Sequence, residues 1–385
     1  MSVDDESAKL NTFYSRLRRD FFPPKRVLWI LNHKTLLPAE VGILRSLGFA
    51  VFVPKIVPQG WEYGNTFVGN DHDAGLFLER NHISILNNQN FYSDRWSIDV
   101  EDLINRNFDV LVTSVYKTPL MEAVNKFQGT VVARVFGRET PRNYTELFES
   151  YDCGLLEKIA SLGNRFMFGQ GYDNLAGIED RRLADRAHAL LVAIPESIWS
   201  RKGTWTGAGP RAVLLLSPKI GDVTYYEELY RAQKSMFKDV PHQIFGRQYS
   251  SVDDPAVLPY LSDDGLLDLY AKSPVFAYTS TEPRHLHYSP IEAMIVGTPV
   301  LYRSGSMIDF LAGAELTGRC ADPLEMRENV IRILNGDRDL ANAIRSDQEQ
   351  IIQTFSTELA RRQWKDAIGV GRMRWLHNAL KLIAS

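Results

Sequence analysis

The residues best suited to chemistry are gathered in one short stretch, 282–292, which reads EPRHLHYSPIE. Within it Ser289, Pro290 and Glu292 have the spacing of a helix start, with the serine as N-cap, the proline at the first helical position and the glutamate at the third. This capping box explains the three residues without a ligand. A helix start also presents unpaired N–H groups and the positive end of the helix dipole, which together bind anions. The alternative interpretation is a phosphate at Tyr288 and Ser289, with Glu292 facing a ribose.

The elements that must position this stretch are short apolar strands alternating with helical patterns. The runs RVLWIL (26–31) and AVLLLS (212–217) predict the first strand of each half of the chain. Strands that alternate with helices predict parallel βαβ units. The pattern therefore favours an α/β fold of two Rossmann-like βα domains facing a central cleft, with ligands at the carboxyl ends of the strands.

A polar segment with several glycines and a proline, SRKGTWTGAGP (200–210), is the best candidate for a linker between the two domains. It predicts a first domain at 1–199 and a second at 211–355. Helical patterns at 356–385 follow the second domain.

The opening stretch lies in a longer segment, LSDDGLLDLYAKSPVFAYTSTEPRHLHYSPIEAMIVGTPVL (261–301). This segment resembles the donor-binding segment of GT-B glycosyltransferases, in particular the glycogen-synthase-like and bacterial polysaccharide enzymes. The resemblance implies a GT-B fold, a nucleotide-sugar donor, no metal ion or other cofactor, and a ribose contact for Glu292. It also implies that the C-terminal helices (356–385) cross back and pack on the first domain. The amphipathic pattern of these helices places Trp364 and Trp375 on an apolar face suited to that packing.

One position departs from the resemblance. The similar enzymes carry a first glutamate eight positions before the second, and this chain has Arg284 there, with Glu282 ten positions before Glu292. Either the loop is longer and Glu282 takes that role, or Arg284 binds a donor phosphate and the role is lost.

Two basic residues follow predicted strands of the second half, where a donor diphosphate would need cations. Lys219 follows the first of these strands and Arg247 ends the next. A lone basic residue is usually a solvated surface charge, but a shared place at strand carboxyl ends favours phosphate contact. The pair His285 and His287 raises the question of a metal site. No third ligand stands at a recognisable spacing, so a backbone or sugar-hydroxyl contact is the better interpretation.

The acceptor side is predicted in the first half. Arg138 and Glu139 follow an apolar strand, and sugar transfer needs a carboxylate or histidine to take the acceptor proton. An arginine–glutamate pair that only caps the loop explains them equally well. His33 follows the first strand and Lys117 follows another, and the aromatic insertion 56–100 could stack on sugars.

The predicted site can be set out by role. The catalytic candidates are Glu139, His33 and Glu282; the donor-binding candidates are Lys219, Arg247, Arg284, His287, Tyr288, Ser289 and Glu292; and the acceptor-binding candidates are Arg138 and Lys117.

The composition is that of an ordinary globular protein. The 385 residues are 44% hydrophobic and 24% charged, and a net charge of −3 gives no reason to expect a nucleic-acid partner. Two widely spaced cysteines, no leader-like N-terminus and no long apolar run predict a cytoplasmic protein. Peripheral contact with the inner face of the membrane is an alternative that the basic C-terminal helices leave open.

These features together predict a glycosyltransferase that moves a sugar from a nucleotide sugar to a hydroxyl of a glycan or lipid-linked glycan, in bacterial surface polysaccharide or glycoconjugate synthesis. Two alternatives stay open. One is a nucleotide-sugar epimerase of the same fold, and the other is a catalytically silent glycan-binding or scaffold module.

Overall fold

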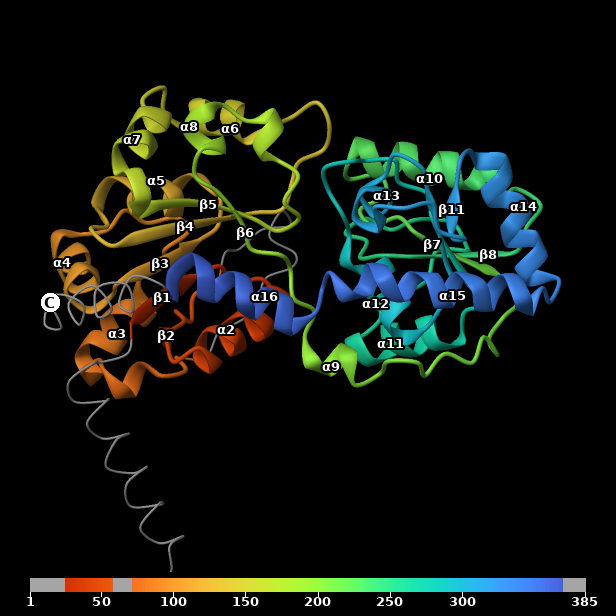
Figure 1. Cartoon of the computed structure of the whole chain (residues 1–385), viewed down its shortest axis with the longest axis horizontal. Helices are drawn as coiled ribbons and strands as arrows, with labels where there is room; N and C mark the ends of the chain where they lie inside the picture. Colours follow the sequence, from red (N-terminus) through yellow and green to blue (C-terminus); the bar gives the residue numbers. More distant parts are fainter. Residues whose placement is uncertain (1–24, 58–70, 370–385) are drawn as a thin grey trace, which may run out of the picture.

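The computed structural model describes residues 25–57 and 71–369, which form two parallel β-sheets side by side (Figure 1). Within these residues the first sheet has the strand order β2-β1-β3-β4-β5-β6 and the second has the order β11-β10-β9-β7-β8. Every pairing of neighbouring strands is parallel. The α/β class predicted from the alternating pattern is confirmed.

The strands are short and most of their side chains are buried. Parallel strands covered by helices on both faces lose contact with water on both sides, which explains why they appear as continuous apolar runs in the sequence. The first sheet contains β1 (Arg26–Ile30), β2 (Ala50–Phe52), β3 (Val110–Thr113), β4 (Thr130–Val135), β5 (Phe166–Gln170) and β6 (Ala187–Ala189). The second contains β7 (Val213–Leu216), β8 (His242–Phe245), β9 (Val275–Tyr278), β10 (Val300–Arg303) and β11 (Arg319–Cys320).

Helices cover both sheets, and several begin at a side chain that accepts an N–H of the first turn, as Ser262 does from Gly265. The helices of the first half are α2 (Leu36–Ser46), α3 (Arg80–Asn88), α4 (Ile98–Asn107), α5 (Lys117–Lys126), α6 (Tyr144–Tyr151), α7 (Leu155–Leu162) and α8 (Arg181–Ala184). Those of the second half are α10 (Thr224–Met236), α11 (Asp263–Lys272), α12 (Tyr288–Val296), α13 (Met307–Ala312), α14 (Pro323–Leu334) and α15 (Arg338–Gln353).

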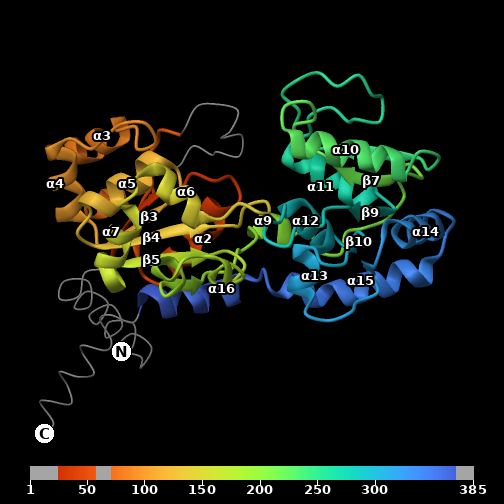
Figure 2. The same ribbon diagram turned by 90° about the horizontal axis from the view of Figure 1, so that it is seen from above.

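Two segments connect the halves and run next to each other. The first contains α9 (Glu196–Trp199), and the second joins α15 to α16 (Thr357–Trp364), which continues as a π-helix, Lys365–Gly369. Figures 1 and 2 show α16 lying against the first half after α15 has crossed the second.

The crossing helix is anchored by a buried tryptophan. Trp364 is 0% exposed, and its ring centroid lies 6.3 Å from that of Trp29 in β1. Further contacts with the first half are a hydrogen bond from the Lys25 Nζ to the Ile368 carbonyl (2.7 Å) and one from the Leu191 N–H to the Gln363 Oε1 (2.8 Å). The predicted return of the C-terminal helices is confirmed up to residue 369. Trp375 and the rest of 370–385 lie outside the described residues.

The predicted insertion 56–100 is folded over much of its length, and 58–70 lies outside the described residues. It contributes α3 and a short 3-10 turn, Ala74–Leu76. Phe91 and Trp96, at 1% and 3% exposure, belong to the core of the first half. These two rings have no free face for a sugar. Trp61, Tyr63 and Phe67 lie outside the described residues, so sugar stacking by the insertion stays a prediction.

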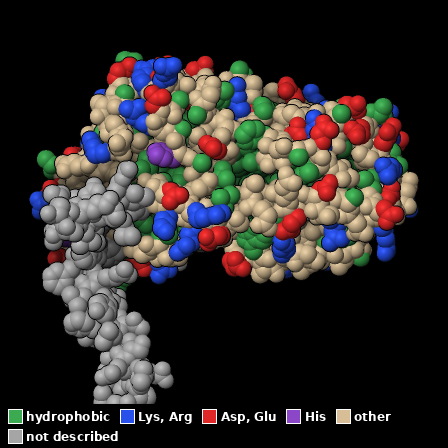
Figure 3. Space-filling model, in the orientation of Figure 1, with side chains coloured by type: hydrophobic (Ala, Val, Ile, Leu, Met, Phe, Trp, Pro, Cys, Tyr) green, Lys and Arg blue, Asp and Glu red, His purple; other side chains and the backbone are tan. Residues whose placement is uncertain are grey.

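None of the described helices is long and apolar enough to cross a membrane. On the face drawn in Figure 3, basic and acidic side chains are interspersed over both halves.

Candidate functional site

Loops that leave the carboxyl ends of strands in both sheets meet between the two halves. From the first sheet come the loop after β1, which carries His33, and the loop after β4 (136–143). From the second come the loop after β7, which carries Lys219, and the loop after β9 (279–287), which leads into α12. The His33 and Tyr288 rings touch edge to face across the junction, with centroids 5.7 Å apart.

The start of α12 differs from the prediction. The helix begins at Tyr288, its N-cap is His287, and no side chain caps it. The predicted capping box, with Ser289 as N-cap and Glu292 at the third position, is therefore wrong. A proline fits anywhere in the first turn, because none of those N–H groups has a partner within the helix, and this allows the helix to start before Ser289. The helix ends at Val296, and the next residue is Gly297, whose φ of +105° suits glycine.

Glu292 is half-buried in the second turn of α12. Its Oε2 accepts a long hydrogen bond (3.5 Å) from the hydroxyl of Tyr270. Burial raises the pKa of Glu292 to about 7, the charge of Asp263 adds to the rise, and the charge of Lys34 opposes it. Lys34 and Asp263 form an exposed ion pair that joins the two halves beside this carboxylate.

His33 is half-buried, and its Nδ1 accepts the backbone N–H groups of Thr35 (3.2 Å) and Leu36 (3.4 Å) at the start of α2. Burial lowers its pKa to about 4. The ring is therefore neutral near pH 7 and carries its proton on Nε2. This geometry suits a hydrogen-bond donor better than a general base.

His287 is held between two tyrosine hydroxyls. Its Nε2 lies 2.9 Å from the hydroxyl oxygen of Tyr226 and its Nδ1 lies 3.1 Å from that of Tyr278. Burial lowers the pKa of His287 to about 3, helped by the charges of His285 and Lys219. Both ring nitrogens are engaged, so His287 is not available as a metal ligand in this arrangement.

Glu139 lies across the junction from this group. Its backbone carbonyl accepts the N–H of Arg142 (3.0 Å), and its side chain is half-buried. Burial and the nearby charge of Glu139 raise the pKa of Tyr226. The carboxylate of the first half thus stands near the Tyr226–His287 pair of the second.

Lys219 and Arg247 stand where the sequence places them, after β7 and β8. Their backbones are joined by a hydrogen bond from the Lys219 N–H to the Arg247 carbonyl (3.0 Å). The charged ends of both lie over the ring of Tyr249, at 5.7 Å and 5.2 Å from its centroid, and the Arg247 guanidinium is also 5.8 Å from that of Tyr260. Two cations are therefore concentrated at this edge of the second sheet.

The loops after β4 and β9 are bonded directly to each other. The backbone N–H and the Oγ of Thr140 donate to the carboxylate of Glu282 at 2.8 Å and 3.0 Å. The guanidinium of Arg284 donates to the carbonyls of Pro141 (3.4 Å) and Arg142 (3.2 Å). Both residues predicted near the donor therefore contact the first half, and a phosphate contact by Arg284 would require it to leave these carbonyls.

The two predicted acceptor residues have different surroundings. Arg138 is half-buried and donates to the Asn143 carbonyl (2.9 Å) within its own loop. Lys117 is an exposed residue that begins α5, and within the described part of the chain it makes no hydrogen bond or ion pair with the other candidates. The structure therefore gathers His33, Glu139, Glu282, Arg284 and the start of α12 at one junction, with Lys219 near His287, while Arg247 lies over Tyr249 and Tyr260 and Lys117 stands apart.

No protein-family model matches the sequence, and no curated protein is significantly similar to it. Solved structures do resemble it. HepE from Anabaena in complex with UDP matches with a TM-score of 0.56 at 14% identity, over 90% of this chain and 100% of that one. A UDP-forming α,α-trehalose-phosphate synthase from Burkholderia xenovorans matches with a TM-score of 0.56 at 10% identity, over 89% and 98%. A glycosyltransferase from Rickettsia africae matches with a TM-score of 0.56 at 12% identity, over 90% and 99%.

The chain has the GT-B fold. The fold resemblance inferred from 261–301 is thus confirmed for nearly the whole chain. Within residues 25–57 and 71–369 of this GT-B chain, no group of three or more His, Cys, Asp or Glu side chains is placed to hold a metal ion. Metal independence stays a prediction.

The structure places further residues at the site that were not predicted from the sequence. Tyr226 is in α10, Tyr270 in α11 and Thr140 in the loop after β4, and each contacts a predicted site residue. Lys34 could have been predicted at the site, because it directly follows His33 in the loop after β1. The tyrosines gave no signal, because an aromatic residue in an amphipathic helix is usually part of the core.

Proposed function

We propose that this protein transfers a sugar from a nucleotide-sugar donor to a hydroxyl of a glycan or lipid-linked glycan acceptor. One observation carries the proposal. The half-buried Glu292 lies in α12, which follows β9, and the cations Lys219 and Arg247 follow β7 and β8 at the same carboxyl edge of the second sheet. In open α/β sheets this edge is where ligands bind.

The donor is proposed to lie along this edge. The unpaired N–H groups at Tyr288 and Ser289 suit a phosphate, and Lys219 and Arg247 balance the charge of the diphosphate. Glu292, when ionised, accepts hydrogen bonds from ribose hydroxyls. The neutral His287 and its tyrosine partners shape the adjoining wall.

Transfer breaks the bond between the sugar C1 and the donor phosphate oxygen, which leaves with the electron pair as the nucleoside diphosphate. The acceptor oxygen forms the new bond to C1 and must lose its proton. Glu139 is the leading candidate to take that proton. The Nε2–H of His33 can donate to an acceptor hydroxyl, and Arg138 and Lys117 are proposed as further acceptor contacts.

The structural neighbours supply the first ligand to test. HepE is in complex with UDP, and the trehalose-phosphate synthase forms UDP. Both support UDP as the first probe for this chain. The proposed setting is bacterial surface polysaccharide or glycoconjugate synthesis, with the protein in the cytoplasm or at the inner face of the membrane.

A thermal-shift panel tests donor binding. Mono- and diphosphates of the five common nucleosides are added to the wild type, to Glu292→Ala, and to Glu328→Ala as a matched control on the exposed side of α14. Ligand at about one hundred times its dissociation constant adds about 2.7 kcal/mol to the native state, which raises the midpoint by a few degrees. One nucleotide should stabilise the wild type and the control but not Glu292→Ala. If none stabilises the wild type, the donor site proposed here does not exist.

A second assay separates transferase activity from its rivals. Arg284 stands where the similar enzymes carry their first glutamate, and this favours a catalytically silent module as the second candidate. Each UDP-sugar is incubated with the protein and a mixture of glycan acceptors and followed by NMR. Transfer releases UDP only when acceptor is present, an epimerase changes the sugar without acceptor, and a silent module changes nothing.

A further inference from the structure

The carboxylate of Glu282 is held by donors from both halves of the molecule. Thr140 of the first half donates its backbone N–H (2.8 Å) and its Oγ–H (3.0 Å), and the N–H of Arg284 donates from Glu282's own loop (2.9 Å). Hydrogen bonds to an ionised carboxylate are stronger than those between neutral groups. Glu282 is thus the central acceptor of a contact between the two halves.

The backbones of the two loops approach each other unusually closely. A Cβ at residue 137 would lie 1.6 Å from the carbonyl oxygen of Arg284, so the contact requires Gly137, whose φ of +81° also suits glycine. The Nδ1 of His285 lies 3.2 Å from the carbonyl oxygen of Phe136. The glycine and the Thr140–Glu282 pair therefore belong to one contact surface.

Each loop is fixed to its own half. The Glu282 carbonyl accepts the N–H of Met307 (2.9 Å), the first residue of α13. The Tyr144 hydroxyl accepts the N–H of Phe136 (3.2 Å) and donates to the Gly137 carbonyl (3.1 Å). A bond between these loops therefore joins the two sheets and not two loose segments.

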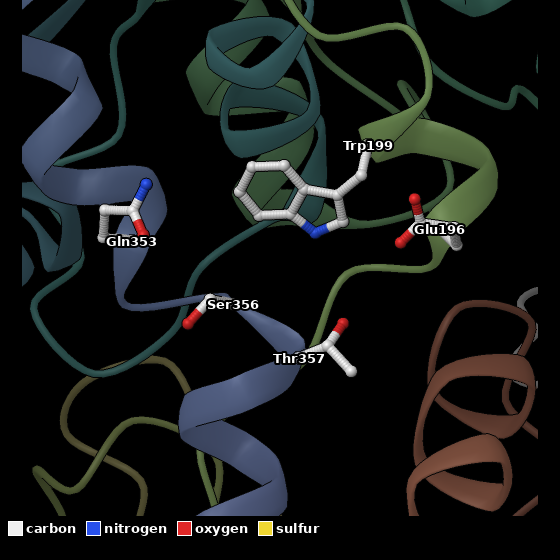
Figure 4. A pocket seen from close by; sticks show the side chains of 5 residues that line it. All are labelled: Glu196, Trp199, Gln353, Ser356 and Thr357. Carbon is white, nitrogen blue, oxygen red and sulfur yellow. The ribbon is translucent and has the colours of Figure 1, made fainter.

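The opposite connection between the halves has a different character. The two crossing segments are held by buried apolar packing, with Trp364 0% exposed. They run side by side around a pocket lined by Glu196, Trp199, Gln353, Ser356 and Thr357 (Figure 4). Thr140 is exposed, so its hydrogen bonds can be exchanged for hydrogen bonds to water at a small net cost in free energy. Moving Trp364 out of its buried site would leave a cavity and is strongly unfavourable.

We propose that Thr140 and Glu282 form a reversible interdomain latch, with the crossing segments as the hinge. The latch holds the halves closed over the junction, and it must open for a ligand to enter or leave. Glu282 is then a gating group whose carboxylate binds the first half. This goes beyond the proposed function, since the latch acts whether or not the ligand is a nucleotide sugar.

The distance between the halves tests the latch in the full-length protein without ligand. Fluorescent labels are placed on the exposed Cys153 of the first half and on a cysteine introduced by Lys238→Cys in the second, while Cys320 is buried. Single-molecule energy transfer then gives the closed and open populations. Glu282→Gln and Thr140→Val weaken the latch, and Asp239→Asn is the control, since it breaks an exposed pair with Arg327 inside one half.

Glu282→Gln should lower the ratio of closed to open molecules by on the order of tenfold, which is the loss of one charged hydrogen bond. Thr140→Val should lower it less, because the backbone N–H stays. The double variant should lower the ratio of closed to open molecules by less than the two single effects combined, since both residues act on one contact. The latch is disproved if both single variants match the wild type and the control. A failure of nucleotide binding would leave this result unaffected.

Discussion

Glu292, His287 and His33 are surrounded by protein at the junction while each keeps part of its surface open. Such surroundings disfavour the charged form of a side chain, so the pKa of Glu292 rises to about 7 and the pKa values of His287 and His33 fall to about 3 and 4. Near neutral pH both histidines are uncharged. Lys219 and Arg247 are the cations that we propose for a donor diphosphate at this edge.

The raised pKa of Glu292 predicts a change of stability with pH. Between its ordinary value of 4.5 and about 7, the unfolded chain loses the proton while the folded protein keeps it, so folding becomes less favourable as pH rises. Glu292→Gln removes this dependence. We therefore expect the free energy of unfolding of the variant, measured with urea and taken relative to the wild type, to rise by on the order of 2 kcal/mol between pH 4.5 and 7.5. Glu328→Gln, on an exposed surface, should gain nothing, and an equal result for both would contradict the account.

The two hydrogen bonds of His287 predict a second effect. His287→Phe leaves the hydroxyls of Tyr226 and Tyr278 without this partner, and we expect a loss of about 2 kcal/mol in the free energy of unfolding at pH 8. The unfolded wild type takes up a proton below about 6.5 while the folded protein does not, so the wild type weakens at acid pH. The cost of the substitution should therefore shrink by about 1 kcal/mol at pH 5.5. Tyr226→Phe, which keeps the imidazole, should show no such shrinkage.

At the scale of elements, the strands could be predicted from the sequence because burial on both faces leaves an uninterrupted apolar run, as in 26–30 and 213–216. The start of α12 could not be predicted to the residue. Pro290 is compatible with several positions in the first turn, and the spacing of Ser289 and Glu292 fits more than one of them. The helix α3 within 56–100 was missed because the segment as a whole is rich in Gly, Asn and aromatic residues, which gives it the look of an irregular insertion.

The crossing helix α16 carries a prediction of its own. Trp364 packs on Trp29, and the Arg134 guanidinium lies 5.6 Å from the centroid of its ring. Trp364→Ala should lower the free energy of unfolding by about 3–5 kcal/mol, because it empties a fully buried site. Leu324→Ala, at a position that is 63% exposed, is the control and should change it little. A similar small effect at Trp364 would mean that α16 is not anchored as described.

At the scale of the whole molecule, the two sheets are joined by buried apolar packing on the crossing side. On the other side they are joined by polar contacts between the loops after β4 and β9 and by the His33–Tyr288 ring contact. The crossing of α16 was predictable from the resemblance of 261–301 to a known fold. The pairing of Thr140 with Glu282 was not, because it depends on how the halves are placed, and local spacing carries no such information. The proposed donor residues Lys219 and Arg247 follow strands and could be found by position, whereas Tyr226 and Tyr270 become apparent only in three dimensions.

A crystal structure of the protein soaked with UDP tests the proposed donor site. We expect the ribose hydroxyls on the carboxylate of Glu292 and a phosphate at the N–H groups that begin α12, within reach of Lys219 or Arg247. UDP bound elsewhere, or bound at this edge without contact to Glu292, would contradict it.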